Sequence, residues 1–401
     1  MKEAVAITGL GVMAPHGDDP QAVFAALMRA DSALAPIFPE LPKPAVAATV
    51  AFDESRWFTK LQLAGVDRVS QLAVAAADLA LRDAGAGGAF DPERIGVYAG
   101  CGMGGAAALE AAYRGGGRVP PLTIPAFMPN APAAQVAMRH GVHGPVLTYS
   151  VACASSAVAI AEAAKAVQRG DVDLAIAGGS EALIVPGVVL AWQAMQTLAA
   201  VKPGEEASAV RPFASDRSGF ALGEGAAFMV LESAGRARAR GARVHARLSG
   251  WGLSCDAFHL TKPDAQGQAR ALRQALREAD IPVRDIGYCN AHGTATRIGD
   301  VVEHDALAAV WGSDLDGLRV SSTKALHGHL LGAAGALEAV ITVLALQRRE
   351  LPPNAHCATI DPACRLNLVA LSGETAPQLE AAICNSFAFG GTNSVLLFTR
   401  D

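Results

Sequence analysis

A cysteine able to act as a nucleophile, Cys153, stands between an apolar strand-like segment and an Ala-rich stretch, residues 155–168. The free N–H groups and the dipole at a helix N-terminus stabilise a thiolate. A fall in the thiol pKa from about 8.5 to about 7 would raise the thiolate fraction at neutral pH on the order of tenfold. Taken alone, a free cysteine in such a context is more often a small buried hydrophobe.

Two histidines lie in segments that could expose an imidazole. His292 follows a strand-like segment and precedes Gly293, which permits an exposed turn. A neutral imidazole there can donate one N–H to an oxygen, and the hydroxyls of Thr294 and Thr296 can bond an amide-rich substrate arm. The alternative for His292 is a loop histidine with satisfied hydrogen bonds.

The second histidine, His329, begins the run His-Leu-Leu-Gly-Ala-Ala-Gly, which has the pattern of a helix start. Lys324 precedes it by five residues, and Glu338 lies on the predicted helix. Lys324 could polarise the site, although a lysine is more often a surface residue. Few surface segments are this rich in Gly and Ala around paired histidines, so we favour a functional role.

Near the C-terminus, Phe389 is followed by two glycines in the run Asn-Ser-Phe-Ala-Phe-Gly-Gly-Thr-Asn, residues 385–393. Two glycines after an aromatic residue allow a left-handed turn and a close backbone approach. The amide of Phe389 could then point into an oxyanion hole. Alone, the run is only a β-turn.

The segments around these residues alternate as in a βαβ fold. Apolar β-branched runs predict strands, and Ala-rich periodic stretches predict helices. The predicted strands are 94–100, 172–178 and 318–321. The predicted helices are 70–83, 155–168, 269–279 and 330–347.

A weak internal similarity between two segments of the sequence predicts a duplication. Cys153 and His329 each follow a short apolar segment, and each opens an Ala-rich helix that ends in Gln and Arg. If both halves share one topology, the two reactive groups face each other across a pseudo-twofold axis. We place the halves at 1–246, with the nucleophile, and 247–401, with the two histidines. No low-complexity linker marks the division, so we expect one continuous core.

Composition is that of a large α/β enzyme. The chain has 401 residues, of which 51% are hydrophobic and 18% charged. The formal net charge of −5 gives no basic excess for nucleic acid. Scattered basic residues could still recruit an acidic protein partner; these are Arg56, Lys60, Arg68, Arg114 and Arg118.

We expect a cytoplasmic protein without a membrane span. The seven cysteines form no close CxxC pair, which suits a reducing compartment. The first residues have the pattern of a strand and loop rather than of a signal peptide. Two uncharged stretches, 141–161 and 182–201, are each about long enough to cross a bilayer. Both are interrupted by a Gly and Pro pair, so we expect buried strand-to-helix units.

Together, these segments resemble the type I/II beta-ketoacyl-[acyl carrier protein] synthases of the thiolase superfamily. That family has an ACAS-like nucleophile region, an HGT loop, a GHLLGAAG helix and an NSFxFGGTN turn, and all four occur here in order. Runs at 178–182, 211–213 and 216–225 extend the resemblance over nearly the whole chain. The resemblance implies an α/β thiolase-like duplicated fold, two similar halves with mixed sheets layered between helices (αβαβα).

The resemblance also implies roles for the residues. Cys153 matches the acylated nucleophile, and His292 and His329 complete a Cys-His-His set, which differs from the Cys-His-Asn set of initiating synthases. His327 has no family role. The remaining matches are Lys324 and Glu338, which organise the site, Thr294 and Thr296, which hold the phosphopantetheine arm, and Phe389, which supplies an oxyanion amide and a gate.

The implied reaction is decarboxylative Claisen condensation of an acyl group, held on Cys153, with malonyl-ACP. The products are 3-oxoacyl-ACP and CO2, in fatty acid or type II polyketide or polyene biosynthesis. The implied partners are acyl carrier protein, which brings acyl-ACP and malonyl-ACP, and a second subunit in a homodimer or a ketosynthase-type heterodimer. No cofactor is implied, because the ACP carries the phosphopantetheine arm.

The chain departs from the family pattern in two places. Ala388 stands beside Phe389 where a glycine is frequent, and Ser155 and Ser156 replace a threonine-glycine-like pair after the nucleophile region. These positions bear on the gate and on the acyl pocket, and they leave a specialised polyketide or polyene role open.

Three other functions compete with this interpretation. The run 100–105 fits the GxGxxG pattern of dinucleotide-binding dehydrogenases, but 111–161 contains no acid to hold the ribose. A non-catalytic chain-length partner subunit would keep the fold, but such subunits typically lose the nucleophile, which is present here. A metal hydrolase is the third alternative, although its residues match no standard spacing; they are His292, Asp300, His304, His327 and His329.

Overall fold

Eleven strands form one mixed sheet in the computed structural model, which describes residues 3–401. The sheet order is β13-β11-β10-β15-β16-β9-β1-β8-β6-β4-β5. The strands of the first half are β1 (Val5–Met13), β4 (Ile95–Gly100), β5 (Val146–Tyr149), β6 (Leu174–Glu181) and β8 (Gly225–Ser233). Those of the second half are β9 (Ala246–Cys255), β10 (Tyr288–Asn290), β11 (Arg319–Ser321), β13 (Asn367–Leu368), β15 (Ala381–Phe387) and β16 (Thr392–Thr399).

The two halves of the sheet repeat one topology. The order β1-β8-β6-β4-β5 corresponds to β9-β16-β15-β10-β11, with the same sequence of antiparallel and parallel pairs. The halves join where β1 pairs with β9 over three residue pairs, from Val5 with Leu248 to Ile7 with Ala246. The predicted division after residue 246 therefore falls at the first residue of β9.

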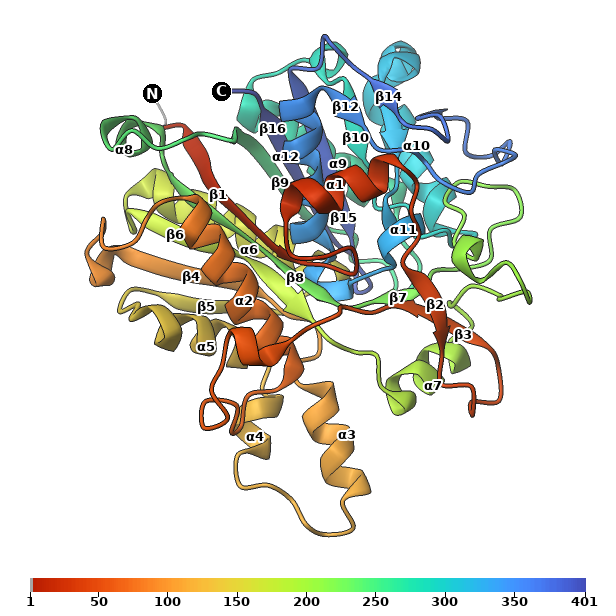
Figure 1. The fold of residues 1–401 in the computed structure, drawn as a ribbon. Coiled ribbons are helices and arrows are strands. Elements are labelled where there is room, and N and C mark those ends of the chain that lie inside the picture. The colour runs from red at the N-terminus through yellow and green to blue at the C-terminus, as the bar shows by residue number, and fades with distance from the viewer. Residues whose placement is uncertain (1–2) are drawn as a thin grey trace.

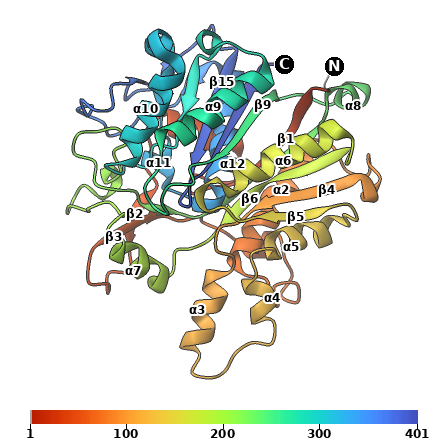
Figure 2. The same ribbon diagram turned by 180° about the vertical axis from the view of Figure 1, so that it is seen from behind.

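Helices complete five layers (Figures 1 and 2). The outer helices of the first half are α2 (Arg68–Asp83) and α5 (Ala131–His140), and those of the second half are α9 (Ala265–Ala279) and α10 (Gly299–Trp311). Between the halves lie α6 (Ser155–Arg169) and α12 (Ala334–Arg348), which contact each other and strands of both halves. The predicted αβαβα arrangement is confirmed.

The central helix α12 has no polar face over most of its length. Residues 334–346 are all buried, so this segment fits only inside a core. The segment Leu331–Arg348 is long and apolar enough to cross a membrane, but 89% of it is buried inside the molecule, as in a core helix. Of the two stretches considered from the sequence, 141–161 contains β5 and the start of α6, whereas 182–201 contains a helix without a strand.

The predicted helices occur with small shifts at their starts. α2 and α6 match within two residues. α9 begins four residues earlier than predicted, because the Asp264 carboxylate caps it by accepting the N–H of Gly267. The stretch predicted to be helical from residue 330 begins with a 3-10 turn, η7 (Leu331–Ala333), before α12 starts.

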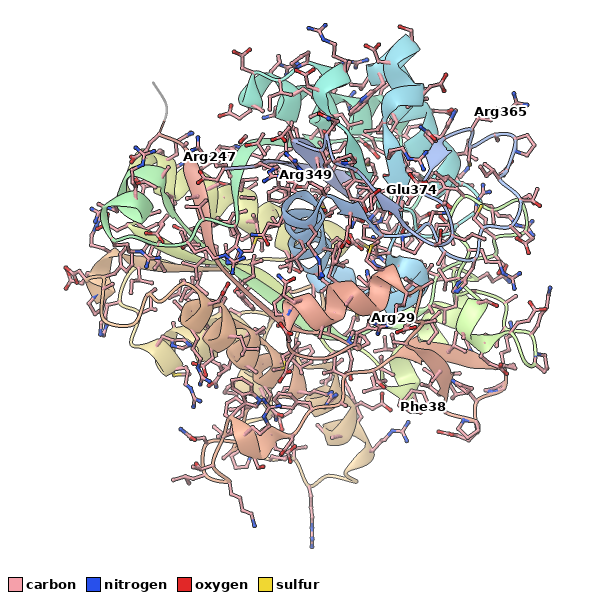
Figure 3. The ribbon with its side chains drawn as sticks, turned by 45° about the horizontal axis from the view of Figure 1, so that its top comes forward. Arg29, Phe38, Arg247, Arg349, Arg365 and Glu374 are labelled. Atoms are coloured by element: carbon pink, nitrogen blue, oxygen red, sulfur yellow. The ribbon has the colours of Figure 1, made fainter. Side chains whose placement is uncertain are left out.

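Smaller elements surround these layers. α3 and α4 project from the body of the molecule below the first half (Figure 1). Charged side chains gather on the outside, among them the exposed Arg29 and Arg365 (Figure 3). The remaining helices are α1 (Pro20–Met28), α3 (Ala106–Arg114), α4 (Thr123–Phe127), α7 (Pro186–Ala194), α8 (Ala234–Ala239) and α11 (Lys324–His327). The remaining strands are β2 (Leu34–Ile37), β3 (Ala45–Ala48), β7 (Leu222–Gly223), β12 (Glu350–Leu351) and β14 (Glu374–Thr375).

Candidate active site

The structure brings Cys153, His292 and His329 together at the junction of the two halves. The Sγ atom of Cys153 lies 3.1 Å from Nε2 of His329. The rings of His292 and His329 are nearly perpendicular, with centroids 5.4 Å apart. The sulfur and one nitrogen of each imidazole lie within 4.8 Å of one another. A nucleophile, a nearby base and a second N–H donor therefore share one site.

Cys153 sits on a strained turn that leads into α6. It lies in the 3-10 turn η3 (Ala152–Ala154), and Ala152 has φ of 49°, a conformation that residues with a Cβ rarely adopt. The hydroxyl of Ser155 fastens this turn, since it accepts the N–H of Val151 (2.9 Å) and donates to the carbonyl of Ala152 (2.6 Å). In the corresponding turn of the second half, η7, Leu331 has φ of 46°.

The other departures from the family pattern also fit their surroundings. The Ser156 hydroxyl oxygen accepts the N–H of Ala336 (2.9 Å), and so links α6 to α12. Ala388 donates its N–H to the carbonyl of Thr392 (2.8 Å) and does not have a left-handed backbone. An alanine is therefore accommodated at residue 388 without strain.

The thiol of Cys153 is protonated in the free protein. Burial raises the pKa of Cys153 to about 12, against the opposing effects of the Lys324 charge and the Phe389 amide N–H. The predicted fall in this pKa is wrong, because the loss of solvation outweighs the favourable field of the helix start. The same contact places the amide N–H of Phe389 at the sulfur.

Both histidines are neutral. Burial, and then the Lys324 charge, lower the pKa of His292 and of His329 well below the ordinary value. A neutral imidazole has one N–H to donate and one nitrogen to accept a proton. Nδ1 of each ring has no hydrogen-bond partner among residues 3–401, whereas Nε2 of His329 accepts the protonated thiol of Cys153.

Lys324 acts on this site although it does not line the cavity. Its Nζ lies 2.5 Å from Oε1 of Glu338, and both side chains are fully buried. Burial raises the pKa of Glu338 to about 7, and Lys324 opposes that shift. Lys324 is not among the residues that line the cavity at Cys153, so its effect on the two histidines is electrostatic.

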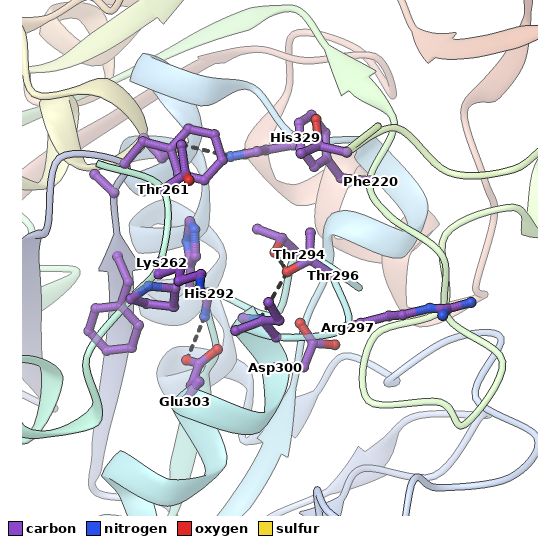
Figure 4. A pocket seen from close by; sticks show the side chains of 18 of the residues that line it. Phe220, Thr261, Lys262, His292, Thr294, Thr296, Arg297, Asp300, Glu303 and His329 are labelled. Carbon is purple, nitrogen blue, oxygen red and sulfur yellow. Dashed lines mark hydrogen bonds between the residues drawn. The ribbon is translucent and has the colours of Figure 1, made fainter. Parts of the chain in front are cut away.

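A second carboxylate, which the sequence analysis missed, holds the loop of His292. Glu303 accepts the N–H groups of His292 (Figure 4) and Gly293, each at 2.8 Å, and the amide of Asn385 at 3.0 Å. One helical turn earlier on α10, Asp300 accepts the N–H of Phe213 at 2.8 Å. The sequence does contain a feature that points to these acids, since two acidic residues one turn apart begin the helix that follows the histidine loop.

The first half contains an equivalent clamp at the glycine-rich loop 100–105. Glu181 accepts the N–H groups of Gly102 (2.8 Å), Met103 (3.3 Å) and Gly332 (3.0 Å). Two of the amides that would bind a pyrophosphate in a dinucleotide-binding protein therefore already bind a carboxylate. This geometry removes the support for the dehydrogenase alternative.

The trio opens into a cavity of about 610 Å³. Thr294 and Thr296 line it, with their hydroxyl oxygens 3.1 Å apart (Figure 4). The Trp192 ring lies 6.1 Å from that of Phe389, and Phe220 packs edge-on against His329 at 5.3 Å. The cavity therefore has a hydroxyl-bearing wall and an aromatic wall, as an amide arm and an acyl chain require.

The residues considered for a metal hydrolase do not converge. His304 bonds to its neighbour Asp305 (3.0 Å). His327 bonds to Thr323 Oγ1 (2.9 Å) and to the carbonyl of Gly328 (2.8 Å). Only His292 and His329 of that set meet in the described structure, so the set does not form a metal centre.

Comparisons with known sequences agree on one family along the chain. Residues 2–237 match the family described as Beta-ketoacyl synthase, N-terminal domain, and residues 245–358 match Beta-ketoacyl synthase, C-terminal domain. Nodulation protein E of Rhizobium meliloti is 40% identical, covering 100% of both chains. The 3-oxoacyl-[acyl-carrier-protein] synthase 2 of Staphylococcus aureus (strain COL) is 35% identical over 99% of this chain and 98% of its own.

Solved structures share the fold over the full length. A ketosynthase complex described as a type II PKS acyl-carrier protein with its ketosynthase bound to the hexaketide aligns with a TM-score of 0.92 and 27% identity. The ishigamide ketosynthase/chain length factor aligns with a TM-score of 0.91 and 32% identity. Each alignment covers 100% of both chains.

Glu303→Ala is expected to destabilise the protein. The change leaves two buried N–H groups and one buried amide without their acceptor, at about 1–3 kcal/mol for each group. We expect a loss of about 3–5 kcal/mol in the free energy of unfolding, measured by urea denaturation. Asp305→Ala, on the exposed side of the same helix, is the control and should change stability by less than about 0.5 kcal/mol. A Glu303→Ala protein as stable as this control would contradict the clamp.

Glu181 is expected to make stability depend on pH. Burial raises the pKa of Glu181 from 4.5 to about 7. Between these values the folded protein holds a proton that the unfolded chain has lost, so this contribution to stability declines as pH rises through the window. The glutamine of the variant Glu181→Gln does not titrate. The free energy of unfolding of the variant minus that of wild type should therefore increase by about 3 kcal/mol from pH 4.5 to pH 8. Urea denaturation at four pH values measures the difference, and a constant difference would disprove the assignment.

Proposed function

This chain belongs to the beta-ketoacyl synthase family, and from that premise we propose that Cys153, His292 and His329 carry the reaction it catalyses. The reaction is decarboxylative condensation of an acyl group with malonyl-ACP to give 3-oxoacyl-ACP and CO2. One observation supports the proposal above all: Sγ of Cys153 lies 3.1 Å from Nε2 of His329, at a cavity that His292 also lines.

The first step transfers the acyl group from the carrier arm to Cys153. Because burial raises the pKa of Cys153 to about 12, the thiol needs a base as its sulfur attacks the thioester carbonyl. His329 Nε2 is within reach of that proton and passes it to the sulfur of the departing arm. The N–H groups of Cys153 and Phe389 stabilise the tetrahedral oxyanion.

The second step forms the nucleophilic carbon. The malonyl thioester oxygen accepts hydrogen bonds from His292 and His329, in tautomers that carry the proton on the nitrogen facing the cavity. The bond between the malonyl carboxylate and its neighbouring carbon breaks, CO2 leaves, and the electron pair becomes an enolate on the thioester. Neutral imidazoles suit this step, since each can donate an N–H without holding a full charge.

The third step joins the two chains. The enolate carbon attacks the acyl carbonyl on Cys153, and the same two N–H groups stabilise the oxyanion. The carbon–sulfur bond breaks, and Cys153 leaves as a thiolate and regains one proton from solvent. Every step uses groups of this chain, the arm and solvent, so we propose that no metal or redox cofactor takes part.

The partner we propose is acyl carrier protein, docked at the rim of the cavity. The exposed cations Lys262 and Arg297 line the cavity and form no ion pair within the described part of the chain (Figure 4). Leu260 and Ile298, close to these cations in the chain, also line the cavity and are 74% and 56% exposed. A cationic rim with exposed apolar side chains suits an acidic carrier. The ketosynthase complex with an acyl-carrier protein supports this choice.

The basic residues first considered for docking lie elsewhere. None of them lines the cavity, and three form ion pairs with neighbouring acids. These pairs are Arg56 with Asp18, Arg68 with Glu224 and Arg114 with Glu110.

We further propose that the enzyme works in the cytoplasm and pairs with a second subunit. Its chemistry needs a reduced thiol, which supports a cytoplasmic location. Strand β5 is an edge strand, and its Val146 and Leu147 are 38% and 45% exposed, which supports pairing with another chain. Similarity to a ketosynthase/chain length factor supports a heterodimer, and a homodimer is the other assembly that we consider. In either assembly, Cys153 makes this chain the catalytic subunit.

Substitutions in the trio should separate the steps. Cys153→Ala should abolish acyl loading, and His329→Ala should slow both loading and decarboxylation. His292→Ala should load normally but decarboxylate malonyl-ACP about 100- to 1,000-fold more slowly, because it loses one oxyanion donor. Intact-mass spectrometry measures loading, and release of CO2 measures decarboxylation.

The control for these variants is His304→Ala, because His304 does not line the cavity and its ring bonds to Asp305. Loading at full extent on Cys153→Ala would show that another cysteine is the nucleophile. Equal losses of loading and decarboxylation in His292→Ala would contradict the division of roles.

Reversing the charges of Lys262 and Arg297 should weaken the binding of the carrier protein without changing the reaction of the arm. The double variant Lys262→Glu with Arg297→Glu should raise KM for malonyl-ACP about tenfold or more at low salt. It should leave kcat/KM for malonyl-pantetheine, which lacks the protein, unchanged. Arg365→Glu, an exposed arginine that does not line the cavity, is the matched control. Equal effects on both substrates would place the defect in the arm's path rather than at the docking surface.

A further inference from the structure

A buried amide side chain at the start of α9 has no hydrogen bond. Gln268 is 1% exposed and lines the cavity at Cys153. Its Oε1 is buried without a partner, and its side-chain nitrogen donates to no described residue. Buried polar atoms in proteins are nearly always bonded, so an unbonded carboxamide in the wall of a cavity requires an explanation.

The backbone around Gln268 is fixed. Its N–H donates to the carbonyl of Asp264 (3.2 Å), whose carboxylate accepts the N–H of Gly267 (2.9 Å). The carbonyl of Gly267 accepts the hydroxyl of Ser254 (2.7 Å). These contacts hold the first turn of α9, and with it the backbone of Gln268, beside the cavity that its side chain lines.

The other glutamines of α9 have ordinary environments. Gln274 accepts the N–H of Leu253 at 3.0 Å. Gln266 is exposed to solvent. Among the three, Gln268 alone is both buried and unbonded within the described structure.

We propose that Gln268 binds an amide group of the substrate's pantetheine arm. This inference rests on the proposed function, which brings that arm through the cavity that Gln268 shares with Thr294 and Thr296. A carboxamide presents one acceptor and two donor hydrogens, and each arm amide presents one donor and one acceptor. Side chain and arm can therefore form two hydrogen bonds at once. The bound arm satisfies the amide that the empty protein leaves unbonded.

In this role Gln268 lowers the stability of the free protein, although it strengthens the binding of substrate. An apolar side chain of similar volume in the same place removes an unsatisfied buried amide. Gln268→Leu should therefore raise the melting temperature and weaken arm binding in the same protein. A glutamine with a purely structural role would show the opposite change in stability.

The test compares malonyl thioesters that do and do not contain an arm. Malonyl-pantetheine has two amides, whereas the ethyl thioester of malonate has none. Gln268→Leu should lower kcat/KM for decarboxylation of malonyl-pantetheine about tenfold, the effect of one or two lost hydrogen bonds. It should leave kcat/KM for the ethyl thioester unchanged. Gln266→Leu, the same substitution on the exposed side of this turn, should change neither.

Each outcome decides the inference. Unchanged kcat/KM for malonyl-pantetheine, or equal losses on both thioesters, would overturn the binding role of Gln268. The same assay tests the proposed function separately. A folded wild-type protein that decarboxylates neither thioester would contradict the proposed function. A thermal unfolding scan of both leucine variants shows that loss of activity does not come from unfolding.

Discussion

The close approach of α6 and α12 is the constraint on which the site depends. A Cβ on Gly335 would lie 2.8 Å from that of Ala157, so the two helices meet at a contact that only small side chains allow. Cys153 stands in the turn just before α6, and His329 stands just before the turn that starts α12. Packing these helices together therefore brings a thiol and an imidazole from opposite halves within 3.1 Å.

Buried acidic side chains hold the loops that complete this arrangement. In each half, a carboxylate accepts two consecutive N–H groups of the loop that follows a central parallel strand: Glu181 after β4, and Glu303 after β10. The acids come from different elements, the end of β6 in one half and α10 in the other. In the second half, burial lowers the pKa of both histidines, and the positive charge of Lys324 lowers it further, so that both are neutral. The halves thus share a scaffold but differ in electrostatics, and the chemistry uses that difference.

Much of the fold and the site could be predicted from the sequence, because local patterns encode them. The helix that follows Cys153, the turn at Phe389 and the repeat of strand and helix are visible in periodicity and in glycine spacing. The pKa of Cys153 was predicted in the wrong direction, because a helix start is a local signal whereas burial depends on the packing of distant segments. Glu303 was missed for the same reason: an acid at a helix start is usually exposed, and its bonds to His292 exist only in the folded loop. Gln268 has no sequence signal, since an unbonded amide is defined by what surrounds it.

The seam between the halves has a consequence for how the chain folds. β1 and β9 pair over only three residues, and α12 touches strands from both halves. Neither half can cover its central helix without the other, so an isolated half would expose the apolar surface of α6 or α12 to water. The contacts that bury them join residues far apart in the chain, a topology associated with slow folding and with populated intermediates. During synthesis, the face of α6 that packs on α12 therefore stays uncovered until residues 334–348 have been made.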